Sequence, residues 1–172
     1  MRALTKLEVE IAKLWLDFDG TYQKLLQKGK VPEQLRIVPL SGAPYLPVRD
    51  LLTAQVGGNA LLLDRQLASG HFCSVSSKVA CIGPEVVGVM LAHVTKEEAE
   101  VDFTAVQPGP LRSSLYVMLG RALLAELRAK GVPTLRLSTY NTGIIKSVRR
   151  AGGNALENQL HYGLDLRGDV KP

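Results

Sequence analysis

The segment at residues 99–153 constrains the fold of this chain more than any other part of the sequence. It begins with a run of β-branched and aromatic residues, which is typical of a strand, and continues into an apolar stretch of helical length. Glycine and proline residues separate these stretches. The segment predicts, in order, a strand (99–106), a turn (107–110), a helix (115–130), a second strand (134–138) and a short helix that ends at residues 151–153.

The turn before the first helix is a candidate site for a phosphate group. Arg112, Ser113 and Ser114 stand just before the apolar stretch and supply one cationic side chain and two hydroxyl groups. Backbone N–H groups converge where a helix begins, and the helix dipole favours negative charge there. A strand that leads through such a turn into a helix therefore predicts an anion-binding site.

The rest of the chain predicts a sheet with helices on both of its faces. Residues 73–82 and 86–94 have the composition of strands, and Gly83-Pro84 between them predicts an antiparallel hairpin. The remaining expected elements are strands at residues 35–38 and 159–166 and helices at residues 48–55 and 60–69. This order predicts the α/β class, with a mixed and mostly antiparallel central sheet.

The start of the sequence predicts an N-terminal helical extension over residues 1–33. Thr5 and Glu8 have the spacing of a capping box, and apolar residues recur at helical spacing up to Phe18. We interpret this helix as packed on the edge of a domain over residues 34–172, so that the whole chain is one globular unit. The alternative is that the helix contacts a partner protein or forms a homodimer with a second copy of the chain.

The composition is that of a soluble globular domain in a reducing compartment. The chain has 172 residues, of which 46% are hydrophobic and 22% are charged. No apolar run reaches the ~18 residues of a membrane helix, and charged residues near the start argue against a signal peptide. We expect a cytoplasmic protein with two reduced cysteines, Cys73 and Cys81, whose spacing matches no zinc site.

The formal charge of +5 has two interpretations, a nucleic-acid-binding surface or a basic pocket for an anionic cofactor. Basic residues are dispersed along the sequence, and the local concentration is Lys146, Arg149 and Arg150. These three residues lie at helical spacing next to the expected anion site. We therefore favour the cofactor pocket and expect neither a nucleic acid nor a membrane as partner.

Several of these residues resemble motifs of the GCN5-related N-acetyltransferases. In that family a strand ends in a Val-x-Pro-like corner, an Arg/Gln-x-x-Gly-x-Gly/Ala turn cradles the CoA pyrophosphate, and an Asn-x-x-Ala-x-x-x-Tyr helix follows later. Here residues 106–108 resemble the corner, Arg112 the leading basic residue, and Asn141-x-x-Ile144 the start of the last helix. The resemblance covers residues 35–166 and implies the acyl-CoA N-acyltransferase fold, with acetyl-CoA or another acyl-CoA as co-substrate and no metal.

The resemblance also implies which residues contact the cofactor. The pantetheine arm would lie along the backbone of the first strand, and the pyrophosphate would lie at the start of the helix. Asn141 would hold the pantetheine region, although an asparagine at this place is also an ordinary N-cap. The implied cofactor-binding residues are Thr104, Ala105, Val106, Arg112, Ser113, Ser114, Leu115, Tyr116, Val117, Asn141 and Lys146.

Three positions depart from the family pattern. Leu115 and Val117 stand where the family has the two glycines of the turn, which narrows the approach of a pyrophosphate to the backbone. Val148 stands where the family often has a tyrosine that acts as the general acid. The resemblance therefore implies the fold and a CoA site more strongly than it implies turnover.

Acyl transfer to an amine requires a group that accepts the proton of the amine. Glu100 is the first candidate, because its strand resembles the one that carries the catalytic glutamate in histone-acetylating members of the family. Asp102 is the second, since alternation along a strand places it on the same face; water is a further alternative. The candidates for the general acid are Tyr116, Tyr140, Tyr162, Ser138 and Thr139.

Three functional hypotheses follow from the sequence, and the least favoured is a basic RNA- or ribosome-associated protein, which would need a clustered basic face. The other two share the resemblance described above. The first is an N-acetyltransferase that moves an acetyl or other short acyl group from acyl-CoA to an amine by direct attack in a ternary complex. The second is a catalytically weak or inactive module of the same fold that binds CoA or a protein partner. The sequence does not identify the acceptor, which is a small molecule or a protein.

Overall fold

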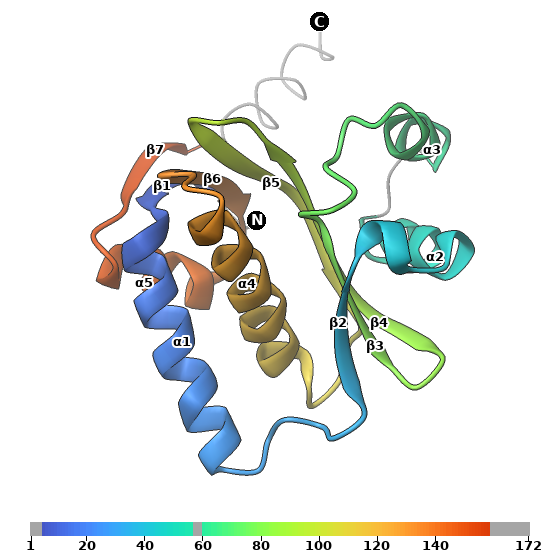
Figure 1. The fold of residues 1–172 in the computed structure, drawn as a ribbon, viewed down its shortest axis with the longest axis horizontal. Coiled ribbons are helices and arrows are strands. Elements are labelled where there is room, and N and C mark those ends of the chain that lie inside the picture. Colours follow the sequence, from blue (N-terminus) through green and yellow to red (C-terminus); the bar gives the residue numbers. More distant parts are fainter. Residues whose placement is uncertain (1–4, 57–59, 159–172) are drawn as a thin grey trace, which may run out of the picture.

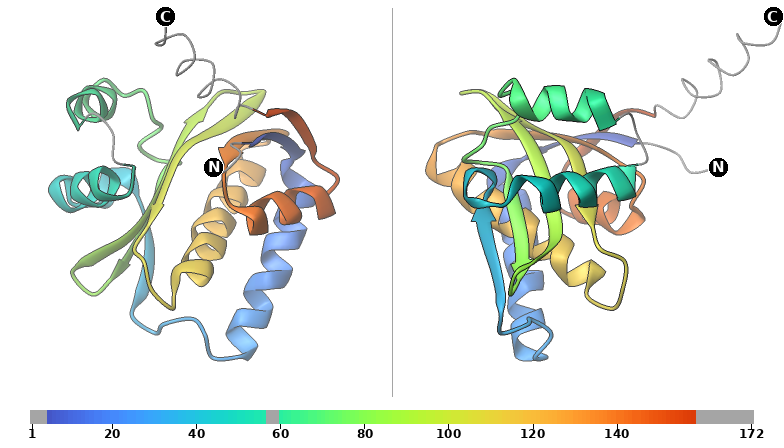
Figure 2. Two further views of the ribbon diagram at one scale, coloured as in Figure 1. Left: turned by 180° about the vertical axis from the view of Figure 1, so that it is seen from behind. Right: turned by 90° about the vertical axis from the view of Figure 1, so that its right-hand side faces the viewer.

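The computed structural model describes residues 5–56 and 60–158 and contains a seven-stranded sheet between two layers of helices (Figure 1). The elements are, in order, β1 (Thr5–Glu10), α1 (Ile11–Gln27), β2 (Leu35–Pro39), the 3-10 turn η1 (Leu40–Gly42), α2 (Tyr45–Val56), α3 (Ala60–Ala68), β3 (Lys78–Ile82), β4 (Glu85–Val94), β5 (Glu98–Val106), α4 (Arg112–Ala129), β6 (Thr134–Thr139), α5 (Thr142–Arg150) and β7 (Asn154–Asn158). Helices α1, α4 and α5 cover one face of the sheet, and α2 and α3 cover the other, as the two views of Figure 2 also show.

The strands follow the order β2-β3-β4-β5-β6-β1-β7 across the sheet. Every neighbouring pair is antiparallel except β5 and β6, which run parallel. This arrangement confirms the predicted fold class. Two parallel neighbouring strands need a crossover connection from the end of one to the start of the other, and α4 forms this connection between β5 and β6. The start of α4 therefore lies just beyond the end of β5.

A hydrophobic core lies on each face of the sheet. The core beneath α1, α4 and α5 includes Leu119, Leu123 and Leu127, and the core beneath α2 includes Leu52 and Leu91. These side chains are all at most 1% exposed. The helices thus direct their apolar residues to the sheet, and among residues 5–56 and 60–158 none is long and apolar enough to cross a bilayer.

Most expected elements are present. The observed β2, α2, α3, β4, β5, α4 and β6 overlap the predicted ranges. Gly83 has a φ of 58° in the turn that joins β3 to β4 in an antiparallel pair, as the sequence predicts. Helix α4 begins at Arg112, ahead of the apolar stretch that predicts it, so Arg112, Ser113 and Ser114 belong to the first turn of the helix.

The predicted helix start within residues 5–10 is wrong, because these residues form β1. Leu7 and Val9 alternate with more exposed neighbours and are both buried, so the two-residue period of a strand prevails over the capping-box spacing. The carboxylate of Glu8 accepts a hydrogen bond from Nε of Arg136 on β6, at 2.8 Å, instead of capping a helix. Strand β1 lies inside the sheet, between β6 and β7, and α1 follows it.

Two further strands differ from the predicted ranges. Strand β3 is confined to Lys78–Ile82, because the preceding residues form a turn in which the N–H of Ser77 donates to the carbonyl oxygen of Cys73 at 2.8 Å. Strand β7 has no counterpart among the expected elements. The strand expected at residues 159–166, which includes Tyr162, lies outside the described residues.

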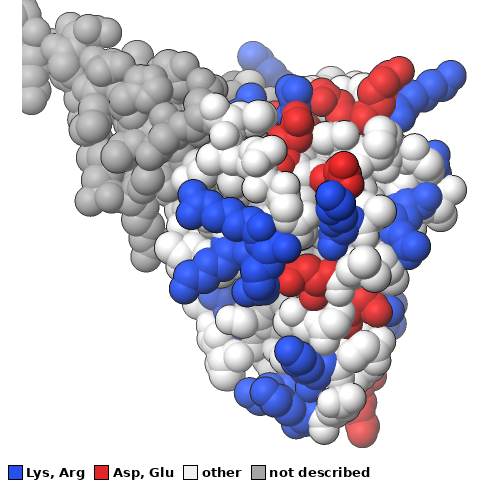
Figure 3. Space-filling view, turned by 90° about the vertical axis from the view of Figure 1, so that its left-hand side faces the viewer, with Lys and Arg blue, Asp and Glu red and all other residues white. Residues whose placement is uncertain are grey.

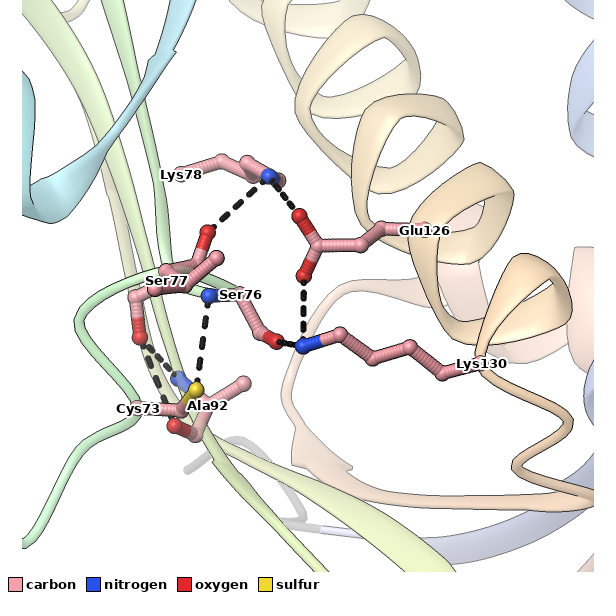
Figure 4. Close-up of polar contacts among 8 residues, drawn as sticks. Cys73, Ser76, Ser77, Lys78, Ala92, Glu126 and Lys130 are labelled. Atoms are coloured by element: carbon pink, nitrogen blue, oxygen red, sulfur yellow. Dashed lines mark hydrogen bonds and ion pairs between the residues drawn. The ribbon is translucent and has the colours of Figure 1, made fainter.

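A polar network joins the start of β3 to α4 (Figure 4). Nζ of Lys78 donates to Oε1 of Glu126 at 2.6 Å. Nζ of Lys130 lies 3.4 Å from the other carboxylate oxygen of Glu126 and donates to Oγ of Ser76 at 2.9 Å. The N–H of Ser76 in turn donates to Sγ of Cys73 at 3.4 Å. The network therefore connects the C-terminal half of α4 to the sheet.

Candidate functional site

Strands β5 and β6 separate before either of them ends. Their parallel pairing runs over four residue pairs, and the last of these is Val101 with Leu137. In the described part of the chain, β5 continues to Val106 and β6 to Thr139 without further pairing between the two. The sheet is therefore open on the side where β5 leads into α4 and β6 leads into α5.

A cavity of about 520 Å³ lies at this opening. Small-molecule sites in proteins have volumes of roughly 300–1,000 Å³. The wall includes Leu14 and Phe18 of α1 as well as Gln55 of α2. Because α1 and α2 cover opposite faces of the sheet (Figure 1), the cavity extends through the plane of the sheet. The polar side chains in its wall include Asp102, Thr104, Arg112, Ser138, Thr139 and Asn141.

A β-bulge in β5 sets the position of Asp102. Phe103 pairs with Leu91 and Val101 pairs with Ala92, which leaves Asp102 as the extra residue on β5. The bulge also changes the face to which neighbouring residues point, because Val101 packs in the core beneath α4 and Phe103 packs in the core beneath α2. Bulges re-aim side chains, often next to active sites, and here the bulged residue lies in the cavity wall.

The carboxylate of Asp102 is largely buried and incompletely satisfied. Its side chain is 24% exposed, and Oδ2 accepts no hydrogen bond from the described residues. Burial raises the pKa of this carboxyl, the carboxylate of Glu100 raises it further, and His71 and His93 lower it by smaller amounts. Asp102 is thus suited to accept a proton from a group in the cavity, whereas Glu100 is not part of the cavity wall.

Two histidines lie beside Asp102. Nε2 of His71, in the loop before β3, is 3.7 Å from Oδ2 of Asp102. The ring of His71 stacks on that of His93 with 5.4 Å between centroids, and Nδ1 of His93 is 3.0 Å from the carbonyl oxygen of His71. The three residues come from separate segments of the chain, so no local motif in the sequence identifies them as a group.

Arg112 is the first residue of α4, and its exposed side chain contributes to the cavity wall. Its guanidinium carbon lies 5.8 Å from the centre of the Tyr116 ring, one turn along the helix. Tyr116 also lines the cavity. A cation at a helix N-terminus that is stacked on a ring and turned to a cavity is a suitable group for binding a phosphate.

The backbone donors at the start of α4 differ in their availability. The N–H of Leu115 donates to the carbonyl oxygen of Leu111 at 2.9 Å and is engaged in the helix. The N–H groups of Ser113 and Ser114 precede it in the first turn, where helix geometry provides no acceptor within α4. Ser113 and Ser114, rather than the residues after them, therefore present free backbone donors at this end of the helix.

Asn141 is both the N-cap of α5 and a cavity residue. Its Oδ1 accepts a hydrogen bond from the N–H of Ile144 at 3.2 Å, as the capping interpretation predicts. Its own N–H donates to Oγ1 of Thr139 at 3.0 Å. The first bond orients the side chain and the second holds the backbone of Asn141 at the end of β6, and the residue lies in the cavity wall.

The expected cofactor residues divide into two groups. Those that line the cavity are Thr104, Arg112, Tyr116 and Asn141. Those that do not are Ala105, Val106, Ser113, Ser114, Leu115, Val117 and Lys146. Of the candidates for a general acid, Tyr116, Tyr140, Ser138 and Thr139 line the cavity. Val148, which is fully buried, also forms part of the wall and has no proton to donate.

The basic residues of α5 lie outside the cavity wall. Lys146, Arg149 and Arg150 are exposed, and Figure 3 shows the side of the molecule on which α1 and α5 lie, with basic and acidic side chains next to each other. Arg150 donates from Nε to Oδ1 of Asp17 at 3.0 Å. Lys146 and Arg149 make no ion pair with the described residues. Among these residues no group of three His, Cys, Asp or Glu side chains is placed to hold a metal.

Comparison with solved structures identifies the fold. A GCN5-related glucosamine N-acetyltransferase region of a fungal GH3 β-N-acetylglucosaminidase superimposes with a TM-score of 0.64 at 10% identity, over 91% of this chain and 20% of that chain. A GCN5-related N-acetyltransferase from Sphaerobacter thermophilus gives 0.59 at 15% identity, over 92% and 49%. A GNAT family acetyltransferase from Elizabethkingia anophelis, solved with acetyl-CoA bound, gives 0.52 at 18% identity, over 69% and 75%.

The comparisons do not reach beyond the fold. No protein-family model matches the sequence, and no curated protein matches it either. The chain spans about half the length of the Sphaerobacter protein and 58% of a functionally unknown conserved protein from Staphylococcus epidermidis, which superimposes with a TM-score of 0.60 at 12% identity. The shared property is the overall arrangement of the sheet and helices.

Proposed function

We propose that this chain, which has the fold of the GCN5-related N-acetyltransferases, transfers an acyl group from acyl-CoA to an amine. The observation that carries the proposal is the cavity at the separation of β5 and β6, whose wall includes residues from the helical layers on both faces of the sheet. Such a cavity lets a thioester enter from one face and an amine from the other. Direct transfer requires this geometry, because both reactants must be held together.

The cofactor would bind across the starts of α4 and α5. Arg112 and the free N–H groups of Ser113 and Ser114 would hold the pyrophosphate. The backbone of residues 104–106 and the amide of Asn141 would contact the pantetheine arm. Lys146, exposed on α5, would reach the 3′-phosphate. These roles follow from the family resemblance, and the burial of Ala105 and Val106 restricts them to backbone contacts.

Asp102 is the proposed general base. The amine nitrogen attacks the thioester carbonyl carbon, the proton of the amine passes to Asp102, and the C–S bond breaks to release CoA thiolate. Asp102 is preferred to Glu100, because Asp102 lines the cavity and has an unsatisfied buried oxygen. Tyr140, an exposed residue of the cavity wall, is the proposed donor of a proton to the thiolate.

A second candidate function is a CoA-binding or partner-binding module with little turnover. Leu115 favours it, because this side chain is 2% exposed and packs in the core where the family has a turn glycine. Val148 favours it as well, since it places an apolar group in the wall of the cavity. The two functions differ in whether an amine is acylated, and a cytoplasmic location is part of the proposal for both.

Calorimetric titration of the full chain with CoA and with acetyl-CoA tests the proposal. We expect micromolar binding of both, and loss of at least tenfold in affinity for Arg112→Ala, since one charge-assisted phosphate contact contributes roughly 1.5–3 kcal/mol. Arg65→Ala removes an exposed arginine from α3, on the opposite face of the sheet, and is the matched control. Absence of binding to the wild-type protein would overturn both functions that involve CoA.

A further inference from the structure

The two sides of the cavity carry different side chains. Arg112, Tyr116 and Asn141 come from the starts of α4 and α5, which cover one face of the sheet (Figure 1). Gln55 comes from α2, which covers the other face. The proposed function assigns the side of α4 and α5 to the acyl-CoA. The amine then approaches from the side of α2, and the wall on that side determines which amines fit.

Asp102 and Phe103 both lie on the face that α2 covers. The ring of Phe103 packs in the core beneath α2, edge-on to Phe72 with 6.0 Å between the ring centroids. Phe72 contacts the ring of His71 edge-on at 4.9 Å, and Nε2 of His71 is 3.7 Å from Oδ2 of Asp102. Consecutive residues of a regular strand point to opposite faces, and the bulge removes this alternation. We define the acceptor side of the cavity as Gln55, Asp102 and Phe103.

The acceptor side is negatively charged. It carries the carboxylate of Asp102, and Glu100 adds a second carboxylate that acts on the first: burial raises the pKa of Asp102, and the charge of Glu100 raises it further. A wall with negative charge attracts a protonated amine, which is the form of an alkylamine at neutral pH. His71 is charged only when it is protonated, and its charge is then paired with Asp102.

The wall offers no cation to a negatively charged acceptor among the residues that the structure describes. The charged side chains among these wall residues are Asp102 and Arg112. Arg112 is the first residue of α4, where the proposed function uses it for the pyrophosphate. Arg49 of α2 is already paired with Asp64 of α3, with 2.9 Å between Nε and Oδ1. A carboxylate on the acceptor would therefore lie beside Asp102 without a cation.

The absence of a paired cation provides discrimination between acceptors. A carboxylate that leaves water without a partner costs free energy, and a like charge beside it adds to this cost. A site can distinguish two ligands by such a cost alone. The other two residues of the acceptor side are uncharged. The amide of Gln55 can donate and accept hydrogen bonds, and the ring of Phe103 offers apolar contact.

We propose that the acceptor is a primary amine without a carboxylate, whose ammonium group is bound by Asp102 and whose uncharged body contacts Gln55 and Phe103. This inference rests on the proposed function, because it names the second substrate of the same reaction. The ammonium group loses two protons. One passes to Asp102, and the other ends on the sulfur of CoA as the C–N bond forms and the C–S bond breaks. Free amino acids are excluded as acceptors, whereas alkylamines and amino acid amides are included.

The test compares acceptors that differ in one substituent. Release of CoA thiol from acetyl-CoA by the full chain is measured with phenylethylamine, phenylalaninamide and phenylalanine. These compounds share a ring and a primary amine and carry hydrogen, a neutral amide or a carboxylate beside the amine. We expect kcat/KM for phenylalanine to be lower than for either of the others by about tenfold or more, the size of one charge-assisted interaction. Glycinamide and glycine form a second pair with a smaller body.

A substitution in the wall tests the location of the acceptor. Gln55→Arg supplies a cation on the acceptor side and should raise the ratio of kcat/KM for phenylalanine to that for phenylalaninamide by about tenfold or more. Gln66→Arg is the matched control, because it makes the same change on α3 at a residue that does not line the cavity; it should keep the wild-type ratio. The comparison of acceptors with the wild-type protein does not depend on either variant.

The results separate this inference from the proposed function. A preference for the acceptors without a carboxylate that Gln55→Arg reduces supports the inference. Acylation of phenylalanine and glycine as efficient as that of their amides overturns the inference and leaves the proposed function standing. Acylation of none of these amines, with CoA still bound in calorimetry, overturns the inference and favours the CoA-binding module. Absence of CoA binding overturns the proposed function itself.

Discussion

Nε2 of His71 lies 3.7 Å from Oδ2 of Asp102, and this contact joins the loop before β3 to the bulge of β5. The oxygen is buried and accepts no hydrogen bond from the described residues, while the carboxyl as a whole lies in the cavity wall. A protonated His71 stabilises the carboxylate through its charge. The base proposed for acyl transfer is thus adjusted by a residue that lies far from it in the sequence.

Asp102→Asn should remove the general base and leave the cofactor site intact. Base catalysis contributes typically 10²–10⁴-fold to a rate, and we expect a loss of about that size in kcat/KM. Affinity for CoA in calorimetry should change less than threefold, because the substitution is isosteric and leaves Arg112 in place. An equal loss for Glu100→Gln, with Asp102→Asn nearly as active as the wild type, would reassign the base to Glu100.

The value of kcat/KM should fall at acidic pH. The apparent pKa of this fall should be higher than the pKa of an ordinary aspartate. Burial and the charge of Glu100 raise the pKa of Asp102, and activity is lost as pH falls through this value, because the protonated carboxyl cannot accept a proton. Glu100→Gln should move the fall to lower pH, and His71→Gln should move it to higher pH. Shifts of the same sign for both variants would contradict the assignment of the fall to Asp102.

Gly120→Ala should destabilise the fold. The added Cβ atom would overlap the Phe18 ring, and overpacking of a core costs typically 1–3 kcal/mol. The free energy of unfolding in urea measures the effect. Gly20→Ala is the matched control, because Gly20 lies in α1 with no atom within 4 Å of the added group; it should stabilise by about 0.5–1 kcal/mol. Similar effects at both positions would show that Phe18 does not press on Gly120.

Lys78→Met should destabilise the protein by about 2 kcal/mol, below the 3–5 kcal/mol of a fully buried pair, because Lys130 still contacts Glu126. Burial opposes the charge of Glu126, but the hydrogen bond from Lys78 and the charges of Lys78 and Lys130 hold the pKa of this carboxyl below its usual range. The pair therefore stabilises the fold above the pKa of an unfolded glutamate, and its contribution is lost as pH falls through the lower folded value.

Urea unfolding at pH 7 and at pH 3 checks this prediction. The difference in stability between the wild type and Lys78→Met should shrink at the lower pH, as Glu126 becomes protonated in both proteins. Lys96→Met, at an exposed turn position, is the control and should change stability by less than about 0.5 kcal/mol at both values. An unchanged difference at pH 3 would show that the network stabilises through packing alone.

The elements around β5 and α4 follow from the sequence, because each has a strong local signal. Gly109 and Pro110 separate the β-branched run of β5 from the apolar stretch of α4, so the sequence favours a strand, a turn and a helix over any other assignment. The N-terminus carries two competing signals. Thr5 and Glu8 have capping-box spacing, but Leu7 and Val9 have the period of a strand, and only the partners of β1 decide between them.

The site is predictable from the sequence only in part. Arg112 and Asn141 lie at helix starts, which short-range patterns indicate, and the structure places both in the cavity wall. The bulge at Asp102 depends on the register between β4 and β5, which no local pattern determines. The position of His71 depends on a contact of its loop with β4, where the carbonyl oxygen of His71 is 3.0 Å from Nδ1 of His93. Phe18 enters the cavity only because α1 packs on α4, a contact between distant parts of the sequence.

The place of β1 between β6 and β7 determines when the protein can complete its fold. As the chain is synthesised, β1 emerges before the other described elements. Both of its neighbours, β6 and β7, come near the end of the described residues, so the backbone groups of β1 have no partner in the sheet until then. Contacts that span most of a chain slow folding, because loop-closure entropy is lost before they form. Helix α1 follows β1 directly and carries Leu14 and Phe18. The wall of the cavity runs from Leu14 to Val148, so a nascent chain lacks part of this wall until α5 has been synthesised.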